Sequence, residues 1–396
     1  MRNIGLIFSL TRHAGGTYQW AVNILSALKR YQECRDGAQV HIFYADESGE
    51  LLDIRKKFSG FRYCRVGKWE IFWQKIQTRI FIRCPFLIHG LRYMYPLNNL
   101  AAKRRIDLMI FPGASFHPAF YNGRQIFMFT DIAHVFYPQF SEVSANGELR
   151  RRNLLFSYGI RQASRVVVDS NQLRRDVVKY YAGDASKIDV LYQALSKTLE
   201  PEEDSGSEVA RFKSGLPEKY LFYPAQLWAH KNHRNLFLAM KTLIASDPAL
   251  KLVLAGSKKE GFERILSLVK ELGLEEHVIY LGYVQDKFMP VLYEKALALV
   301  MPTYFGPTNI PTLEAFYFGC PAVISDLPGV REQTGDAALL FDPDSPKDIA
   351  DKIMSVIVSP AAREGMICKG RERLKILSYE NYRDSFFAVL DKALVG

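Results

Sequence analysis

The sequence predicts an α/β protein built from two Rossmann-like domains that face each other across a cleft. In each half of the chain, short apolar runs that suit buried strands alternate with stretches of helical periodicity. An acidic and apolar-poor segment, residues 199–207, lies between the halves and suits an exposed linker. With 396 residues and 48% hydrophobic content, the chain can fill two cores. Ligands of such folds bind at the carboxyl ends of the strands.

The N-terminal half opens with a strand, a loop that contains two glycines, and a helix. An apolar run over residues 3–10 predicts the strand, and residues 18–30 place apolar side chains on one face of a helix that Thr17 can cap. Gly15 and Gly16 lie in the loop between them, where amides at a helix start favour an anion. A tight turn that binds nothing is the alternative.

Further apolar runs predict the remaining strands of this half, over residues 40–44, 61–66, 106–111, 125–129, 165–169 and 188–192. Helices are expected over residues 147–163 and 171–181, and Ser170 can cap the second of them. Strands that alternate with helices predict a parallel sheet.

Residues 68–105 mix aromatic, aliphatic and basic side chains, and Glu70 is the only acid among them. Such a mixture suits helices that lie in the interface of an anionic membrane. The alternative is a set of buried helices with basic outer faces. Pro85, Gly90 and Pro96 interrupt any long helix in this segment.

Asp131 and His134 follow the strand predicted at residues 125–129. Polar residues just past a strand's carboxyl end are where α/β proteins form ligand sites. This position allows the two side chains to belong to a ligand site. The alternative is that Asp131 caps a turn and that His134 is a packed core histidine.

The C-terminal half repeats the pattern. Its predicted strands cover residues 220–225, 251–255, 278–281, 296–301 and 320–325. One predicted helix ends near residue 245, and four others cover residues 261–272, 286–295, 346–358 and 380–395. Lys231 lies between the first strand and the first helix, where its ammonium can meet a diphosphate as a point charge. A solvated surface lysine is the alternative.

Residues 304–315 are the most informative stretch of the chain. Gly306-Pro307 breaks regular structure after the strand at 296–301, and Pro311 suits the first turn of a new helix. The helix start offers backbone amides to an anion, those of Thr308, Asn309 and Ile310. Glu314 is expected in the first turn, where it can also accept hydrogen bonds from a ribose diol. The alternative is an ordinary strand–helix unit.

These residues resemble the family 4 glycosyltransferases, which have the GT-B fold. Asn309-Ile-Pro-Thr-Leu-Glu314 is similar to the end of the Glu-x7-Glu signature of that family, with Gly306 at the position of the first Glu. The run Tyr-Pro-Ala-Gln-Leu-Trp-Ala-His-Lys-Asn-His resembles the element that holds the donor diphosphate, with Gln226 in place of its Arg and Lys231 as its Lys. The forms of residues 131–140 and 305–311 resemble a subgroup that makes bacterial surface polysaccharides.

The resemblance implies a retaining transferase that moves a sugar from a UDP- or GDP-sugar to a saccharide or lipid-linked saccharide acceptor, as in O-antigen synthesis. It implies no metal ion and no other cofactor. The catalytic candidates are Lys231, Asp131, His134 and Asn309. The donor-binding candidates, of which Tyr283 and Val284 would hold the base, are Gly15, Gly16, Gln226, Lys231, Tyr283, Val284, Thr308, Asn309, Ile310 and Glu314.

The resemblance also sets the expected domain bounds. These are an acceptor-side domain over residues 1–197, a linker over 198–217, a donor domain over 218–378, and a last helix over 379–396 that packs back on the first domain. The scattered cysteines have no metal-ligand or redox spacing and favour a reducing compartment. We therefore expect a cytoplasmic protein, peripheral on the inner face of the membrane through residues 68–105.

Charge is distributed unevenly along the chain. Residues 1–195 hold 28 Lys and Arg against 15 Asp and Glu, whereas the remainder holds 24 against 27. A basic half suggests an acidic partner, such as anionic lipid or a phosphorylated acceptor, and a solvated basic surface is the alternative. Three other functions stay open, namely a GT-B sugar-nucleotide epimerase, a non-catalytic sugar-nucleotide-binding partner and a nucleic-acid-binding protein. No nucleic-acid motif supports the last, so we expect no nucleic-acid partner.

Overall fold

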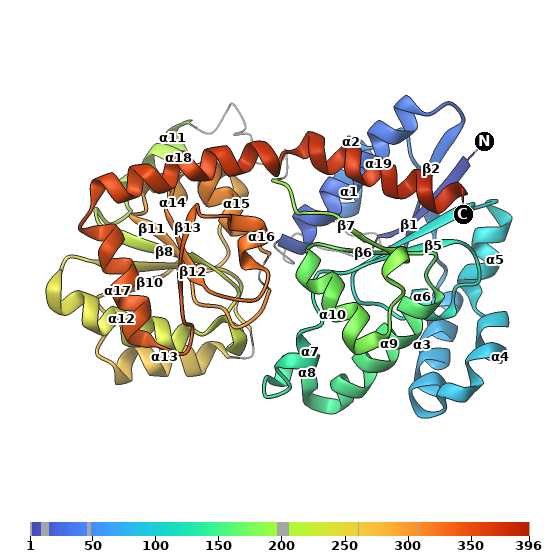
Figure 1. Cartoon of the computed structure of the whole chain (residues 1–396), viewed down its shortest axis with the longest axis horizontal. Coiled ribbons are helices and arrows are strands. Elements are labelled where there is room, and N and C mark those ends of the chain that lie inside the picture. The colour runs from blue at the N-terminus through green and yellow to red at the C-terminus, as the bar shows by residue number, and fades with distance from the viewer. Residues whose placement is uncertain are drawn as a thin grey trace. The chain divides into compact units, whose positions relative to one another are not determined.

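The computed structural model describes residues 2–8, 16–45, 49–195, 206–259, 261–306 and 308–395. By their contacts the residues form two compact units, one of Met1–Tyr192 with Glu380–Gly396 and one of Gln193–Tyr379. Each unit is described by itself below and is shown in Figure 1.

A parallel seven-stranded sheet forms the centre of the N-terminal unit, in the order β3-β2-β1-β4-β5-β6-β7. The strands are β1 (Arg2–Phe8), β2 (Ala38–Tyr44), β3 (Arg62–Arg65), β4 (Leu108–Pro112), β5 (Gln125–Met128), β6 (Arg165–Val168) and β7 (Ile188–Val190). The strands β4, β5 and β6 are almost fully buried, as expected for a parallel sheet that helices cover on both faces.

Helices cover both faces of this sheet, with α1, α2 and α19 on one side and α3, α6, α9 and α10 on the other (Figure 1). The α-helices are α1 (Gly16–Cys34), α2 (Gly49–Lys57), α3 (Lys68–Arg83), α4 (Ile88–Tyr93), α5 (Pro96–Lys103), α6 (His117–Phe120), α7 (Ala133–Phe136), α8 (Ser141–Ser144), α9 (Glu148–Gln162), α10 (Asn171–Tyr181) and α19 (Tyr379–Val395). Short 3-10 helices are η2 (Pro85–Leu87), η3 (Ala145–Gly147) and η4 (Ala185–Lys187).

The last helix, α19, is fastened to the N-terminal unit by polar contacts. Asp391 accepts hydrogen bonds from the Tyr31 hydroxyl and the Arg35 guanidinium, both at 2.7 Å. Arg124 donates to the Leu394 carbonyl at 2.6 Å. These bonds join the chain's last helix to elements more than 250 positions earlier in the sequence.

A parallel six-stranded sheet forms the centre of the C-terminal unit, in the order β10-β9-β8-β11-β12-β13. Its strands are β8 (Tyr220–Pro224), β9 (Lys251–Ala255), β10 (Val278–Tyr280), β11 (Ala298–Met301), β12 (Ala322–Ser325) and β13 (Ala338–Phe341). Its helices are α11 (Gly206–Ser214), η6 (Ala229–Lys231), α12 (His233–Ser246), α13 (Phe262–Glu271), η7 (Asp286–Phe288), α14 (Met289–Lys295), α15 (Ile310–Tyr317), α16 (Val330–Thr334), α17 (Pro346–Ile357) and α18 (Pro360–Ile376). Both strand orders are of the Rossmann type, which confirms the predicted α/β fold class.

The predicted elements recur with shifts of a few residues, and the Ser170 cap is confirmed because its hydroxyl accepts from the Leu173 amide at 3.2 Å. Two predicted details are wrong. Helix α1 begins at Gly16, so Thr17 lies inside the helix and does not precede it. Gly90 does not interrupt a helix but lies within α4.

Several elements have no counterpart among the predicted ones, among them α2, α16 and the three described next. Strand β13 is a four-residue edge strand in which only Phe341 is buried, and α18 buries little beyond Met366 and Gly370. Helix α11 lies inside the expected linker and is anchored by Phe212, whose ring stacks on Phe288 at 4.5 Å. In each of these three elements few apolar side chains face the core. The apolar periodicity from which the element could be predicted is therefore weak.

Candidate functional site

In the C-terminal unit, strand order reverses between β8 and β11, which are hydrogen-bonded neighbours. The loop after β8 carries Gln226 and Lys231, and the loop after β11 leads through residues 302–306 and 308–309 into α15. Open α/β sheets bind ligands outside the carboxyl ends of strands at such a reversal. Most of the sequence-predicted donor-binding residues therefore share one edge of one sheet.

Direct contacts join the two loops. The His230 ring stacks on the Phe305 ring, with centroids 3.9 Å apart and planes at 18°. The Tyr304 amide donates to the His230 carbonyl at 2.9 Å. Because His230 immediately precedes Lys231, these contacts hold the lysine backbone against the loop after β11.

Asn232 adds a third loop to this assembly. Its backbone is left-handed, with φ 54°, and its side chain is buried. The side-chain amide donates to the Pro302 carbonyl at 3.0 Å and to the Pro343 carbonyl at 2.8 Å. The Asn232 side chain therefore joins the loops that follow β8, β11 and β13. Asn is among the few non-glycine residues that adopt the left-handed backbone conformation at low cost.

Lys231 ends the short helix η6 and is half-buried. Its carbonyl accepts a hydrogen bond from the buried Tyr223 hydroxyl at 2.8 Å. Gln226, at the position where the family pattern has Arg, accepts from the Trp228 indole N–H at 2.9 Å through its side-chain oxygen. Lys231 is therefore the cation that this loop brings to the sheet edge.

Asn309 is the N-cap of α15. Its Oδ1 accepts from the Thr312 amide at 3.0 Å and from the Thr312 hydroxyl at 2.6 Å. The Asn309 N–H donates to Gln333 Oε1, and Gln333 Nε2 donates back to the Asn309 carbonyl, both at 3.0 Å. The sequence predicted that this N–H would bind an anion. In the structure it donates to the Gln333 side chain, so an anion that binds the Asn309 N–H must displace Gln333.

Glu314 lies in the second turn of α15, not in the first turn as predicted, because the helix begins at Ile310 after its Asn309 cap. The carboxylate is 4% exposed and accepts from the Tyr293 hydroxyl at 2.5 Å. Burial, followed by the neighbouring Glu314, raises the pKa of Tyr293 well above its ordinary value. The phenol therefore stays neutral and donates to Glu314 over the whole physiological range.

The turn after β10 holds the two residues that the resemblance assigned to the base. Tyr283 is exposed, and Val284 packs against the core of the unit. The preceding Gly282 accepts from the Gly256 amide at 2.8 Å. A Cβ on Gly256 would lie 2.2 Å from the Ala225 carbonyl oxygen, so only glycine permits the ends of β8 and β9 to approach this closely.

The other two catalytic candidates lie in the N-terminal unit. The Asp131 carboxylate accepts from the Ala133 amide at 2.9 Å at the start of α7. His134 is 1% exposed, stacks on Phe156 and shares a 2.6 Å hydrogen bond with the Tyr181 hydroxyl. Burial lowers the pKa of His134 to about 4. The two side chains thus have the cap and core contacts that the sequence left open as the alternative to a ligand role.

Gly15 lies outside the described residues, and Gly16 is the first residue of α1.

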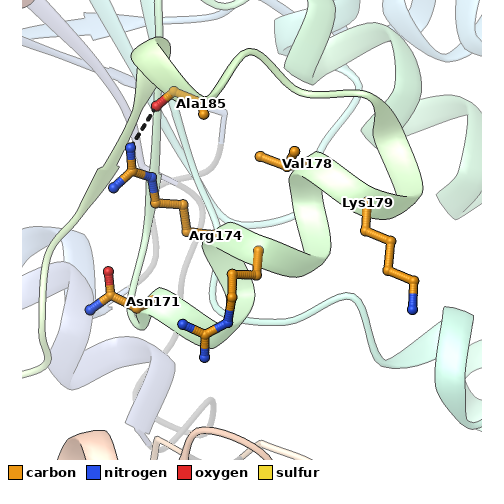
Figure 2. Close-up of a pocket in the computed structure, with 6 residues that line it drawn as sticks. Asn171, Arg174, Val178, Lys179 and Ala185 are labelled. Atoms are coloured by element: carbon orange, nitrogen blue, oxygen red, sulfur yellow. Dashed lines mark hydrogen bonds between the residues drawn. The ribbon is translucent and has the colours of Figure 1, made fainter.

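A basic depression of about 390 Å³ lies beside α10 in the N-terminal unit. It is lined by Asn171, Arg174, Arg175, Val178, Lys179 and Ala185. Figure 2 shows Arg174 reaching the Ala185 carbonyl, to which it donates at 2.9 Å. Sequence reasoning assigned α10 as a helix but missed this depression, because Ala185 of η4, which completes its lining, comes from a separate segment.

Gln333, Tyr293 and Asn232 were also missed as members of the site. The only local sequence pattern near these contacts was Asn309-x-x-Thr312, which matches an N-cap and identifies none of the three. Among the residues that the structure describes, no group of His, Cys, Asp and Glu could hold a metal ion.

Comparison with known proteins agrees with this geometry. Residues 207–373 match the family "Glycosyl transferases group 1", and they span the loops described above. The O-antigen chain mannosyltransferase B of Escherichia coli is 26% identical over 301 residues, 76% of this chain and 78% of that protein. The O-antigen chain mannosyltransferase RfbU of Salmonella typhimurium is 26% identical over 208 residues, 52% of this chain and 55% of its own length.

Solved structures share the fold over the whole chain. Sucrose-phosphate synthase from Thermosynechococcus elongatus aligns with a TM-score of 0.74 at 18% identity, over 99% of this chain and 98% of that one. Anabaena HepE, solved in complex with UDP and glucose, aligns with a TM-score of 0.70 at 17% identity, over 99% and 100% of the two chains. The two Rossmann-type sheets and these alignments show the GT-B fold, which is the fold of a large class of glycosyltransferases. More narrowly, the C-terminal unit is similar to the nucleotide-sugar-dependent glycosyltransferases of family 4, through its match to the group 1 family over residues 207–373.

Proposed function

We propose that the protein transfers a hexose, with retention at the anomeric carbon, from a UDP- or GDP-sugar to a saccharide or lipid-linked saccharide in surface-polysaccharide synthesis. The observation that carries this proposal is the joined pair of loops at the reversal between β8 and β11, which holds the backbone of Lys231 against the loop that leads into α15. Because two O-antigen mannosyltransferases are similar to the chain, mannose is the hexose we favour.

The leaving group of this reaction is a nucleoside diphosphate, so the site must stabilise negative charge that develops on it. We assign this task to Lys231 and to the amides of Thr308 and Ile310 at the start of α15. Asn309, whose N–H is held by Gln333, is proposed to position them as the cap of this helix. In the proposed step, the bond between the anomeric carbon and the phosphate oxygen breaks while the acceptor oxygen bonds on the same face. The acceptor's proton passes to the departing phosphate oxygen, so no protein base is required.

Glu314 is proposed to accept hydrogen bonds from the ribose, with Tyr293 fixing its carboxylate. Tyr283 and Val284 would hold the base, and Gln226 would face the diphosphate as an uncharged neighbour of Lys231. No metal ion enters the proposed step.

On the acceptor side, we assign Asp131 and the Gly15-Gly16 loop to orient the sugar and the acceptor. His134 is too buried to touch either one, so we propose that it positions Asp131 and α7 through its contacts with Phe156 and Tyr181. The basic depression beside α10 suits the phosphate of a lipid-linked acceptor, because arginines bind phosphate in a planar, bidentate manner. Such an acceptor places the enzyme at the cytoplasmic face of a membrane.

Donor binding is tested by thermal shift with GDP-mannose, UDP-glucose, ADP-glucose and the free nucleotides. A ligand present at a hundredfold excess over its Kd stabilises the native state by about 2.7 kcal/mol. We expect one nucleotide to respond, and the response to be lost in Lys231→Ala. Lys241→Ala is the matched control, since this exposed lysine lies on α12, outside the loops. A response that survives Lys231→Ala overturns the site assignment.

Transfer is tested by following radiolabelled sugar from the responding donor into lipid-linked acceptors. Donor consumed only in the presence of acceptor supports the transferase. Donor converted to another sugar nucleotide without acceptor would instead identify an epimerase. In Arg175→Ala/Lys179→Ala we expect a KM for a phosphate-bearing acceptor raised about tenfold with the donor KM unchanged, because each exposed charged contact contributes up to about 1 kcal/mol.

A further inference from the structure

The outer surface of α3, η2 and α4 is unusually apolar for solvent-facing helices. Its exposed large hydrophobic side chains are Trp69, Phe72, Trp73, Ile80, Phe86, Leu87, Tyr93 and Met94. Trp69 is 74% exposed, Phe86 76% and Tyr93 88%. We call these residues the α3–α4 surface. Single exposed hydrophobic residues are ordinary. A group of this size marks an interaction site, and within it the rings of Trp69, Phe72 and Trp73 lie against one another, with centroids 6.0 and 6.2 Å apart.

The α3–α4 surface does not hold the fold together. Helix α3 packs inward through Phe81, which is fully buried against Phe116, Phe120 and Tyr158. Gln77, on the same inner side, donates to the Leu91 carbonyl at 3.3 Å. The spacing of residues 69, 72, 73, 76 and 80 places a second apolar stripe on another side of the same helix. That outer stripe is available to a partner.

Basic side chains border the outer stripe. Lys68, Lys75, Arg79 and Arg83 are all exposed on α3. The spacing of residues 68, 75 and 79 places three of them on one side of the stripe. Glu70, the only acid between residues 68 and 105, is half-buried. Aromatic and aliphatic groups beside a row of cations complement a surface with anionic headgroups above an apolar layer.

We propose that the α3–α4 surface docks on an anionic lipid bilayer, with Trp69, Phe72, Trp73 and Phe86 in the interface and the row of cations on the headgroups. Among the described residues, no helix is long and apolar enough to cross a membrane, so the helix lies on the bilayer. This inference deepens the proposed function by placing the enzyme where a lipid-linked acceptor resides. Lipid binding is nevertheless tested without donor or acceptor, so that either idea can fail alone.

Charge complementarity is the reason for choosing a bilayer over other occupants. A second copy of this chain would bring an equally basic surface against the first, which like-charge repulsion opposes. A nucleic acid would satisfy the cations but leave the apolar stripe in water. Of these three partners, an anionic membrane alone covers both the apolar stripe and the row of cations.

The first experiment measures cosedimentation of the full-length protein with vesicles of phosphatidylglycerol and phosphatidylcholine, and with vesicles of phosphatidylcholine alone. We expect binding to the anionic vesicles that weakens as salt rises, because exposed charges are screened beyond about 8 Å at physiological ionic strength. Trp69 and Trp73 supply a second readout, since their fluorescence should shift to the blue when they leave water. The shift should disappear in Trp69→Phe/Trp73→Phe while cosedimentation persists.

Two variants separate the apolar and the ionic parts of the surface. Trp69→Ser/Phe72→Ser/Trp73→Ser removes the stripe, and we expect at least about a tenfold loss of binding, because each buried CH2 contributes on the order of 0.8 kcal/mol. Lys75→Glu/Arg79→Glu removes the cations, with about fivefold lost per charge near the surface. All five side chains are exposed, so both variants should keep the wild-type Tm.

Matched controls lie in the other unit. Val358→Ser/Ile376→Ser changes exposed apolar residues, and Arg264→Glu/Lys270→Glu makes the same charge change on exposed positions of α13. Both should bind vesicles like the wild type. Equal losses in the controls and in the surface variants would overturn the proposal. So would equal binding to neutral vesicles, concentration-dependent self-association through the stripe, or preference for RNA over vesicles.

Discussion

The side-chain amide of Gln333 forms two hydrogen bonds of 3.0 Å with the backbone of Asn309, one to its carbonyl and one from its N–H. Gln333 is buried on α16, and its own carbonyl accepts from Arg373 of α18 at 2.9 Å. The start of α15, where a donor phosphate would bind, is therefore held by elements that come later in the chain.

We predict that Gln333→Ala raises the KM for the donor about tenfold with a smaller change in kcat, because the helix start loses two bonds of about 1 kcal/mol each. Gln333→Glu keeps the shape but cannot donate to the Asn309 carbonyl, and it places a carboxylate beside the proposed diphosphate. It should bind donor more weakly than Gln333→Ala. Steady-state kinetics over donor concentration check both expectations. An unchanged donor KM in the two variants would remove Gln333 from the donor site.

The hydrogen bond between Tyr293 and Glu314 gives a second prediction. In Tyr293→Phe the buried carboxylate loses a donor, and we expect the unfolding free energy to fall by about 1–3 kcal/mol together with nucleotide affinity. Glu314→Gln keeps a partner for Tyr293 and should retain more stability while it weakens binding of the ribose. Calorimetry of nucleotide binding alongside thermal unfolding separates the two effects. Full affinity for a nucleotide in Glu314→Gln would show that the ribose lies elsewhere.

Gly306 occupies the position of the first Glu in the family signature, and its φ is 79°. No atom lies within 4 Å of the position a Cβ would take, so backbone strain alone opposes a side chain there. Gly306→Ala and Gly306→Glu should each lose about 1 kcal/mol or more of stability. Gly306→Asn should lose less, because Asn tolerates the left-handed region. Urea unfolding ranks the stabilities of the three variants. Equal stability of Gly306→Ala and the wild type would contradict the expected backbone strain at residue 306.

Buried histidines give a pH dependence of stability. Burial lowers the pKa of His41, His117 and His134 to about 4, and that of His233 to about 3. Below pH 6.5 the unfolded chain therefore binds protons that the native state does not. The stabilisation is complete above pH 6.5 and is lost as pH falls towards 4, by about 1.4 kcal/mol per pH unit for each fully affected group.

The measurement is the free energy of unfolding between pH 7.5 and about pH 4.5. His233 is the best position for a variant, because both its ring nitrogens are buried without a protein partner and the ring packs against Tyr223, with centroids 5.1 Å apart and planes tilted by 37°. His233→Phe should flatten the pH dependence, whereas His89→Gln at an exposed position should not. A slope that is unchanged in His233→Phe would contradict the assignment.

The sequence by itself determined the fold class and most elements, since apolar runs and cap residues act over a few positions. Ser170 and Pro311 marked the starts of α10 and α15 because capping is a contact between near neighbours. The residue runs that contain Lys231 and Glu314 carried the resemblance to the family 4 glycosyltransferases. Strand β13 and helix α18 were missed because their burial depends on which elements pack over them.

Only the tertiary structure decided which groups meet. Gln333 reaches Asn309 across 24 positions, and Asn232 reaches Pro343 across 111, so no local pattern could announce either contact. Tertiary packing also showed that the N–H of Asn309 is engaged and that His134 is buried. Tertiary packing also placed the aromatic residues of α3 on the outer surface. Periodicity predicts an apolar stripe on a helix but not whether the stripe faces the core or the solvent. A sequence pattern specifies local geometry, whereas the partner of each face is fixed only when the whole chain packs.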